Sequence, residues 1–141
     1  MKHIARIFAL TFTLLPMLAA AQFNGPRQLV AQVPFQFRVG DKLVPAGKCT
    51  VESATDNSDA MMIRNVGARV SLVSSALPAE SKTAAAQYAM VFHKYGDRYF
   101  LVGIRLKGLH NMYRLPESRG EAELRAQNLP ATEEIVIASR R

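Results

Sequence analysis

Short runs in which apolar and polar residues alternate, separated by turn residues, recur along most of this sequence. The clearest case is the stretch Tyr88–Leu106, in which two β-rich runs flank the dipeptide Gly96-Asp97. A glycine at the first position of a two-residue loop suits the type II′ turn, whose twist matches that of paired strands. The stretch therefore predicts a tight antiparallel hairpin.

The pleat of such a hairpin sorts its side chains onto two faces. If Tyr95 pairs with Arg98, one face is mostly aliphatic, and the other mixes aromatic, methionine and basic side chains. The first face then holds Ala89, Val91, His93, Tyr95, Arg98, Phe100, Val102 and Ile104, and the second holds Tyr88, Met90, Phe92, Lys94, Tyr99, Leu101, Gly103 and Arg105. We expect the first face to be core and the second to be at least partly covered, as in a central hairpin of a sandwich or barrel.

Further strands are predicted wherever the same alternation returns between turns. They cover Leu29–Arg38, with Arg38 on its polar side, Lys48–Ser53, Ala60–Arg64, Arg69–Ser75 and Glu133–Ala138. Pro34 cannot donate to a strand ladder, so it places the first of these runs at a sheet edge or a bulge. The interpretation is an all-β fold, an antiparallel sandwich or partly open barrel of six to seven strands, with one short C-terminal helix.

The helix is predicted from the spacing of Ser118 and Glu121. This spacing is that of a capping box, in which the hydroxyl and the carboxylate accept hydrogen bonds from backbone N–H groups at a helix start. The residues that follow are good helix formers, so we expect a helix over about Arg119–Gln127. The segment Ala76–Gln87 has little periodic hydrophobicity and is expected to be a surface connection.

The start of the chain has the pattern of a secretory signal peptide. Lys2 and Arg6 precede the apolar run Ile7–Leu18, and Ala19-Ala20-Ala21 provides a small-residue cleavage site. A run of about a dozen apolar residues falls short of the roughly 20 that a membrane-spanning helix needs, although an uncleaved anchor is the alternative. We expect a signal peptide at 1–21, a flexible lead-in at 22–28, a single β-rich domain at 29–141, and an exported, periplasmic or secreted protein with no transmembrane span after cleavage.

The charge of the chain bears on its partners. The 141 residues carry a formal net charge of +7, and removal of the leader leaves 16 basic and 11 acidic residues, a charge of +5. In an exported protein this balance indicates an anionic envelope component, a polysaccharide or another envelope protein as partner, and nucleic acid is not expected. A charge that serves only solubility is the plainer alternative.

Little in the mature sequence indicates catalysis or a bound metal. His93 and His110 share no metal-ligand spacing with each other or with Cys49, and no nucleophile or nucleotide motif is present. We expect His93 to be a hydrogen-bonded structural histidine and His110 to be accessible in a loop. Cys49 is expected to be a buried apolar residue, with intermolecular pairing or a reactive thiol as the alternative. The prediction is no enzyme, no catalytic residue, no metal and no cofactor.

Three segments share a recognisable spacing of proline, glycine and aromatic residues. They read V-P-F-Q-F-R-V-G-D-K-L-V-P-A-G-K-C-T-V at 33–51, M-V-F-H-K-Y-G-D-R-Y-F-L at 90–101 and L-P-E-S-R-G-E-A-E-L at 115–124. In this spacing the chain resembles a functionally uncharacterised family of small exported bacterial proteins, known mainly from soil bacteria, whose patterns are V-P-F-x-F-x-V-G-x-x-x-L-P-A-G-x-Y-x-V, V-F-H-x-Y-G-D-x-Y-F-L and L-P-x-S-R-x-E-x-E-L. It departs at Cys49, where an aromatic is usual, and at Gly103–Leu106, where tryptophan is frequent. The resemblance implies an exported β-rich domain and carries over no activity or binding residue.

The second face of the hairpin is the sharpest candidate for a ligand site. Aromatic and basic side chains could form a shelf there for a sugar, a lipid or an anionic polymer. The candidate ligand-binding residues are Tyr88, Phe92, Lys94, Tyr99 and Arg105. The alternative is that they pack beneath a second sheet or the helix. The predicted function is an exported, non-catalytic binding or structural module of the cell envelope or extracellular space, and the alternative is a lipocalin-like carrier of a small apolar ligand.

Overall fold

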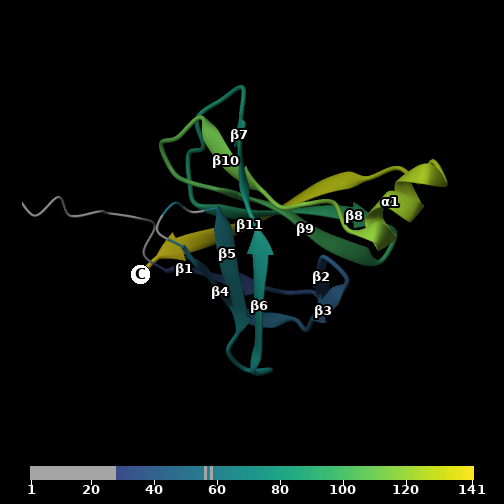
Figure 1. Cartoon of the computed structure of the whole chain (residues 1–141), viewed down its shortest axis with the longest axis horizontal. Coiled ribbons are helices and arrows are strands. Elements are labelled where there is room, and N and C mark those ends of the chain that lie inside the picture. Colours follow the sequence, from purple (N-terminus) through teal and green to yellow (C-terminus); the bar gives the residue numbers. More distant parts are fainter. Residues whose placement is uncertain (1–27, 56, 58) are drawn as a thin grey trace, which may run out of the picture.

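Figure 1 shows the computed structural model, which describes residues 28–55, 57 and 59–141. This part of the chain forms eleven strands and one helix. In chain order they are β1 (Leu29–Val33), β2 (Phe37–Val39), β3 (Lys42–Val44), β4 (Gly47–Ser53), β5 (Ala60–Asn65), β6 (Val70–Ser75), β7 (Leu77–Glu80), β8 (Ala89–Tyr95), β9 (Arg98–Arg105), β10 (Asn111–Arg114), α1 (Arg119–Ala126) and β11 (Thr132–Arg140). The predicted leader lies outside the described residues, as does the predicted lead-in except for Gln28. The predicted all-β class with one short C-terminal helix is confirmed.

A nearly closed barrel arises because one stretch of chain pairs with two distant strands of the sheet. The strands follow the order β3-β2-β9-β8-β11-β1-β4-β5-β6, so β1 pairs with β11 and β2 pairs with β9. Only residues 34–36 separate β1 from β2, and Pro34 falls in this break, where no ladder hydrogen bond is required of it. The path from β9 through β8 and β11 therefore returns to the segment from which it started. In Figure 1, β4, β5 and β6 lie on the opposite side of the molecule from β7, β9 and β10.

Short strands account for most of the difference between the predicted six to seven strands and the eleven observed. β2, β3, β7 and β10 have only three or four residues each, too few for an alternating pattern to be recognised. β7 pairs with β10 and lies inside Ala76–Gln87, the segment predicted to be a surface connection. Pro78 is tolerated in β7 because this strand pairs only with β10 and so lies at a sheet edge.

A β-bulge in the β8–β9 hairpin changes which side chains share a face. The register shifts between Val91 and Phe92, so that Val91 pairs with Gly103 and Val102 is the extra residue of β9. Gly103 and Arg105 therefore lie on the face of Val91. Their predicted placement on the face of Phe92 is wrong, because a bulge leaves no signature in a simple alternating pattern.

Large side chains from several strands fill the interior of the barrel. The largest fully buried ones are Phe37, Phe92, Met61, Ile63, Met90 and Ile104. Phe92 makes edge-to-face contacts with Phe35 and Phe37, with ring centroids 5.1 Å apart in both cases. These contacts hold the β1–β2 stretch against the inner face of β8.

Helix α1 agrees with the predicted helix to within one residue. Ser118 is its N-cap, and the Ser118 Oγ accepts a hydrogen bond of 3.1 Å from the Glu121 N–H. Leu124 packs against Tyr95 and Phe100 near the turn of the hairpin. The Glu121 carboxylate does not fold back onto the cap, contrary to the predicted capping box, but extends to β8. In the part of the chain that the structure describes, no helix is long and apolar enough to span a membrane.

Candidate functional site

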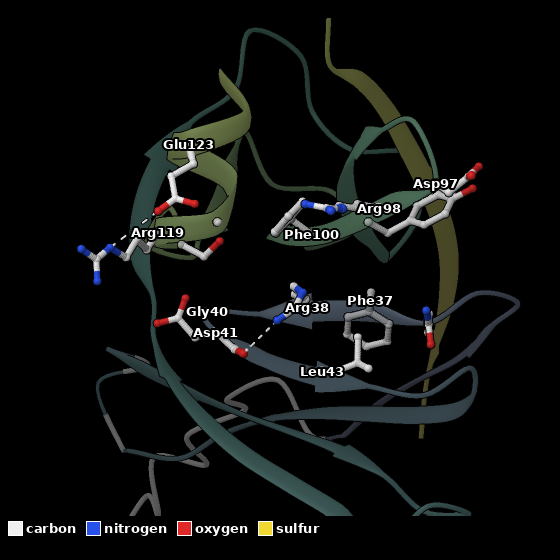
Figure 2. Close-up of a pocket in the computed structure, with 14 residues that line it drawn as sticks. Phe37, Arg38, Gly40, Asp41, Leu43, Asp97, Arg98, Phe100, Arg119 and Glu123 are labelled. Atoms are coloured by element: carbon white, nitrogen blue, oxygen red, sulfur yellow. Dashed lines mark hydrogen bonds and ion pairs between the residues drawn. The ribbon is translucent and has the colours of Figure 1, made fainter. Parts of the chain in front are cut away.

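A cleft of about 480 Å³ lies between the β2–β3 hairpin and the start of β9, and the first turn of α1 forms its third wall (Figure 2). These walls come from parts of the chain that are far apart in sequence. They coincide with the three segments on which the family resemblance rests, because every lining residue falls within 33–51, 90–101 or 115–124. The fold thus gathers the three segments around one opening.

Two similar tight turns border this cleft. Gly40-Asp41 joins β2 to β3, and Gly96-Asp97 joins β8 to β9. The two glycines have φ angles of 57° and 58°, in the left-handed region that favours glycine. Arg38 lies two residues before the first turn and Arg98 directly follows the second, so each turn places an arginine beside the opening.

The pairing of β2 with β9 sets Arg38 and Arg98 on opposite sides of the cleft. β2 runs parallel to β9, with Arg38 opposite Phe100. Phe37 and Val39 are buried, so the strand pleat directs Arg38 away from the core. Figure 2 shows the guanidinium groups of Arg38 and Arg98 in the middle of the opening, one from the β2 side and one from the β9 side.

Within the described part of the chain, these two guanidinium groups are not held in ion pairs. Arg38 donates a 3.1 Å hydrogen bond to the backbone carbonyl of Asp41. Across residues 28–55, 57 and 59–141, neither Arg38 nor Arg98 forms an ion pair. A third cation, Arg119 in the first turn of α1, lies 3.8 Å from the Glu123 carboxylate, a loose contact between two exposed side chains.

The cleft also holds acceptors. Asp41, Asp97 and Glu123 line it together with the three arginines, so its formal charge is balanced. The wall therefore presents guanidinium donors for an acidic group and carboxylate acceptors for hydroxyl or amide donors.

An aromatic stack lies at one side of the cleft. Tyr99 lines the opening and stacks on Phe35, with ring centroids 3.8 Å apart and planes inclined by 9°. The Lys94 amine lies 5.4 Å from the centroid of the Tyr99 ring, within cation–π range. Its interaction with the Tyr99 hydroxyl raises the pKa of Lys94.

The structure brings together only part of the predicted shelf. Lys94 lies over the ring of Tyr99, which lines the cleft, whereas Phe92 is completely buried in the core. Tyr88 is half-buried against the core at the start of β8. Arg105 lies on the other face of the hairpin and pairs with Glu133 at 2.8 Å. A ligand-binding role thus remains a prediction for Lys94 and Tyr99, and Arg105 takes no part in their surface.

Sequence reasoning missed the three arginines of the cleft. In the sequence, Arg38 is one polar residue of an alternating strand pattern, and Arg119 is one residue of the predicted helix. A recognisable signal was the repeated Gly-Asp turn, each copy flanked by an arginine within two residues. What the sequence could not indicate is the parallel β2–β9 contact that joins them, because the paired residues are far apart along the chain.

A second polar group lies on the other side of the hairpin. The Nδ1 atom of His93 is 2.6 Å from Glu121 Oε1, and the Tyr95 hydroxyl donates to the same oxygen at 3.3 Å. Glu121 is 4% exposed, and burial together with the charge of Glu121 raises the pKa of Tyr95. This arrangement matches the prediction of a hydrogen-bonded His93 and fixes α1 to β8. A pocket of about 300 Å³ with apolar walls at Val91 and Met112 lies beside it.

The other candidate residues lie apart from the cleft. His110 is exposed after β9, where its backbone carbonyl accepts a 2.6 Å hydrogen bond from the Ser81 N–H. Cys49 is fully buried, as expected. Within the described residues, no group of three or more His, Cys, Asp or Glu side chains is placed to hold a metal ion. No protein-family model, curated protein or solved structure matches the chain.

Proposed function

We propose that this protein is an exported, non-catalytic binding module, and that its cleft between β2, β9 and α1 holds an acidic group of a cell-envelope or extracellular component. The observation that carries the proposal is the pair Arg38 and Arg98. They face one opening from opposite walls, and neither makes an ion pair within the described residues.

The chemistry of arginine supports an acidic ligand. A guanidinium group presents several N–H donors in a planar fork that matches a carboxylate or a phosphate. Two such groups on opposite walls can hold one acidic group between them. The first turn of α1 adds to this potential, because the N-terminal end of a helix favours negative charge.

The filled interior of the barrel favours ligand binding in the surface cleft over the lipocalin-like alternative, in which an apolar ligand is held inside the barrel. A carrier of that kind needs space inside its barrel for an apolar ligand. Phe37, Phe92 and Met61 occupy the interior instead. The cleft, by contrast, is open to solvent and already holds charged side chains.

A binding role also fits the hydrogen bond made by the serine hydroxyl in the cleft wall. Ser118, the serine in the lining, accepts a hydrogen bond from the Glu121 N–H as the cap of α1. It is thus committed to the helix, and the lining contains neither histidine nor cysteine.

Export is part of the proposal and rests on the leader pattern and on the resemblance to exported bacterial proteins. All the residues that line the cleft belong to the segments that carry this resemblance. Arg38 and Arg98 occupy positions that the family patterns leave open, so the preference for an acidic ligand is proposed for this chain and not for the family.

Co-sedimentation with cell-envelope fractions tests the proposal. The Arg38→Gln/Arg98→Gln variant should lose most of its retention on the pellet at low salt. An Arg140→Gln/Arg141→Gln variant removes the same charge from an exposed strand end far from the cleft lining and should be retained like the original protein. Equal loss in both variants would show that only overall charge matters, and no retention of the unaltered protein would contradict the function itself.

A further inference from the structure

We propose that the cleft is one half of a longer groove and that this groove binds a linear acidic polysaccharide. The inference rests on the proposed function and adds the class and the length of the ligand. A second cleft of about 520 Å³ lies along the other side of the β8–β9 turn. It shares Asp97, Arg98, Gly120 and Glu123 with the first cleft, so the two openings adjoin at these residues.

Helix α1 runs along both parts of this groove. Arg119 and Glu123 line the first cleft, and Glu123 and Gln127 line the second. These three residues are spaced four apart and so lie on one side of the helix, about 12 Å from first to last at 1.5 Å per residue. A linear chain laid along this side meets a cation, a carboxylate and an amide in turn, which is more than a single sugar unit can reach.

The balance of charge in the groove favours a sparsely charged, hydroxyl-rich ligand. Arg38, Arg98 and Arg119 can hold the acidic groups of such a chain. Asp41, Asp97, Glu123 and Gln127 can accept hydrogen bonds from its hydroxyl groups. A densely charged polyanion would gain little net attraction, because the three carboxylates offset the charge of the three arginines. A chain of sugars that carries one carboxylate per unit, separated by several hydroxyls, meets both requirements.

An extended peptide fits the groove less well. Peptides that bind to sheets usually add a strand to an open sheet edge. Here β2 pairs with β3 on one side and β9 on the other, and Phe100 of β9 lies between β8 and β2. β2 and β9, which supply Arg38 and Arg98, therefore have no open edge at the cleft, and recognition by these two strands falls to side chains; the open edge of the sheet here belongs to the three-residue strand β3.

Isothermal titration with uronate oligosaccharides of increasing length tests the inference. The probes are oligomers of polygalacturonate, alginate and hyaluronate, from the single uronate unit to the polymer. For the oligomers that bind, affinity should rise at least about tenfold from the single unit and then level off once both clefts are filled. Neutral methyl esters of the same oligomers should bind at least about tenfold more weakly, because they lack the charge that the arginines require.

A Gln127→Ala variant separates the two clefts. It should weaken binding of the long oligomers and leave binding of the shortest ones unchanged, whereas Gln87→Ala, in an exposed loop, should change neither. Circular dichroism confirms that each variant is folded. Equal affinity for the single unit and the polymer, or no effect of Gln127→Ala, would overturn the long groove and leave the acidic-group site standing. Tighter binding of poly-glutamate than of any uronate would overturn the polysaccharide class. Failure of every acidic probe to bind would overturn the proposed function as well.

Discussion

The Nδ1 atom of His93 on β8 lies 2.6 Å from Oε1 of Glu121 on α1, and this contact fastens the helix to the barrel. The Glu121 carboxylate also accepts a hydrogen bond from Tyr95, so one buried side chain interacts with two residues of β8. Because the outer side of the same helix forms a wall of the cleft, the contact also sets the shape of the candidate site.

Replacing Glu121 by alanine should lower the free energy of unfolding by about 1–3 kcal/mol, because it leaves the buried Tyr95 hydroxyl and the half-buried His93 without their acceptor. Urea denaturation followed by circular dichroism measures the change. Glu123→Ala, on the exposed side of the same helix, is the matched control and should change stability by less than about 0.5 kcal/mol. Equal effects of the two substitutions would show that the contact does not fasten the helix.

The thiol of Cys49 should be unreactive in the folded protein. Burial raises its pKa from 9.0 to about 11, and the attacking species in alkylation is the thiolate. Iodoacetamide at mildly alkaline pH should therefore modify the urea-unfolded chain much faster than the folded one, as read by mass spectrometry. Similar rates in both states would contradict the burial of this residue.

The same pKa shift predicts a loss of stability in alkali. The unfolded chain releases the thiol proton from about pH 9, whereas the folded chain holds it until about pH 11, so the folded state binds more protons in this window. The contribution of Cys49 to the free energy of unfolding is complete below about pH 9 and falls as the pH rises to about 11. A Cys49→Ala variant should lack this decline, and an unchanged decline would assign it to other groups.

The close approach of β10 predicts that Gly103 does not tolerate a side chain. A Cβ atom there would overlap the Met112 Cε and lie 3.2 Å from the Tyr113 carbonyl oxygen. The methionine can move but the backbone cannot, so Gly103→Ala should lower the free energy of unfolding by about 1–3 kcal/mol. Gly67→Ala, where the nearest atom would be 3.7 Å away, should have little effect in the same urea titration.

A double-mutant cycle distinguishes the two parts of this clash. Shortening the side chain in Met112→Ala removes the overlap at Cε, so the added effect of Gly103→Ala should be smaller in that background. A Gly103→Ala variant as stable as the original protein would contradict the close approach of β10 to the bulge.

Features with a local cause could be predicted from the sequence. The Gly96-Asp97 turn and the Ser118 cap each depend on a few neighbouring residues, and both lie where they were expected. The partner of the Glu121 carboxylate could not be predicted in this way. His93 is distant in sequence, and it contacts the carboxylate that the capping box would otherwise use.

The candidate site was only partly predictable for a related reason. Lys94 and Tyr99 follow from strand alternation up to the bulge, but the bulge moves Arg105 to the other face of the hairpin. Arg38 and Arg98 line one cleft only because β2 pairs in parallel with β9, a long-range contact that no local pattern reports. The sequence therefore predicted an aromatic and basic surface on this hairpin but not the cleft beside it.

The measurement that tests the proposed cleft most directly is a ¹H–¹⁵N NMR titration of the protein with a uronate oligosaccharide. We expect the largest chemical-shift changes at Arg38, Arg98 and Gly120, which come from the three walls of the cleft. The Arg38→Gln/Arg98→Gln variant should bind at least about tenfold more weakly, since hydrogen bonds to charged groups contribute about 1.5–3 kcal/mol each. Shift changes confined to β4–β6 or to the terminal Arg140 and Arg141, or none at all, would contradict the proposed cleft.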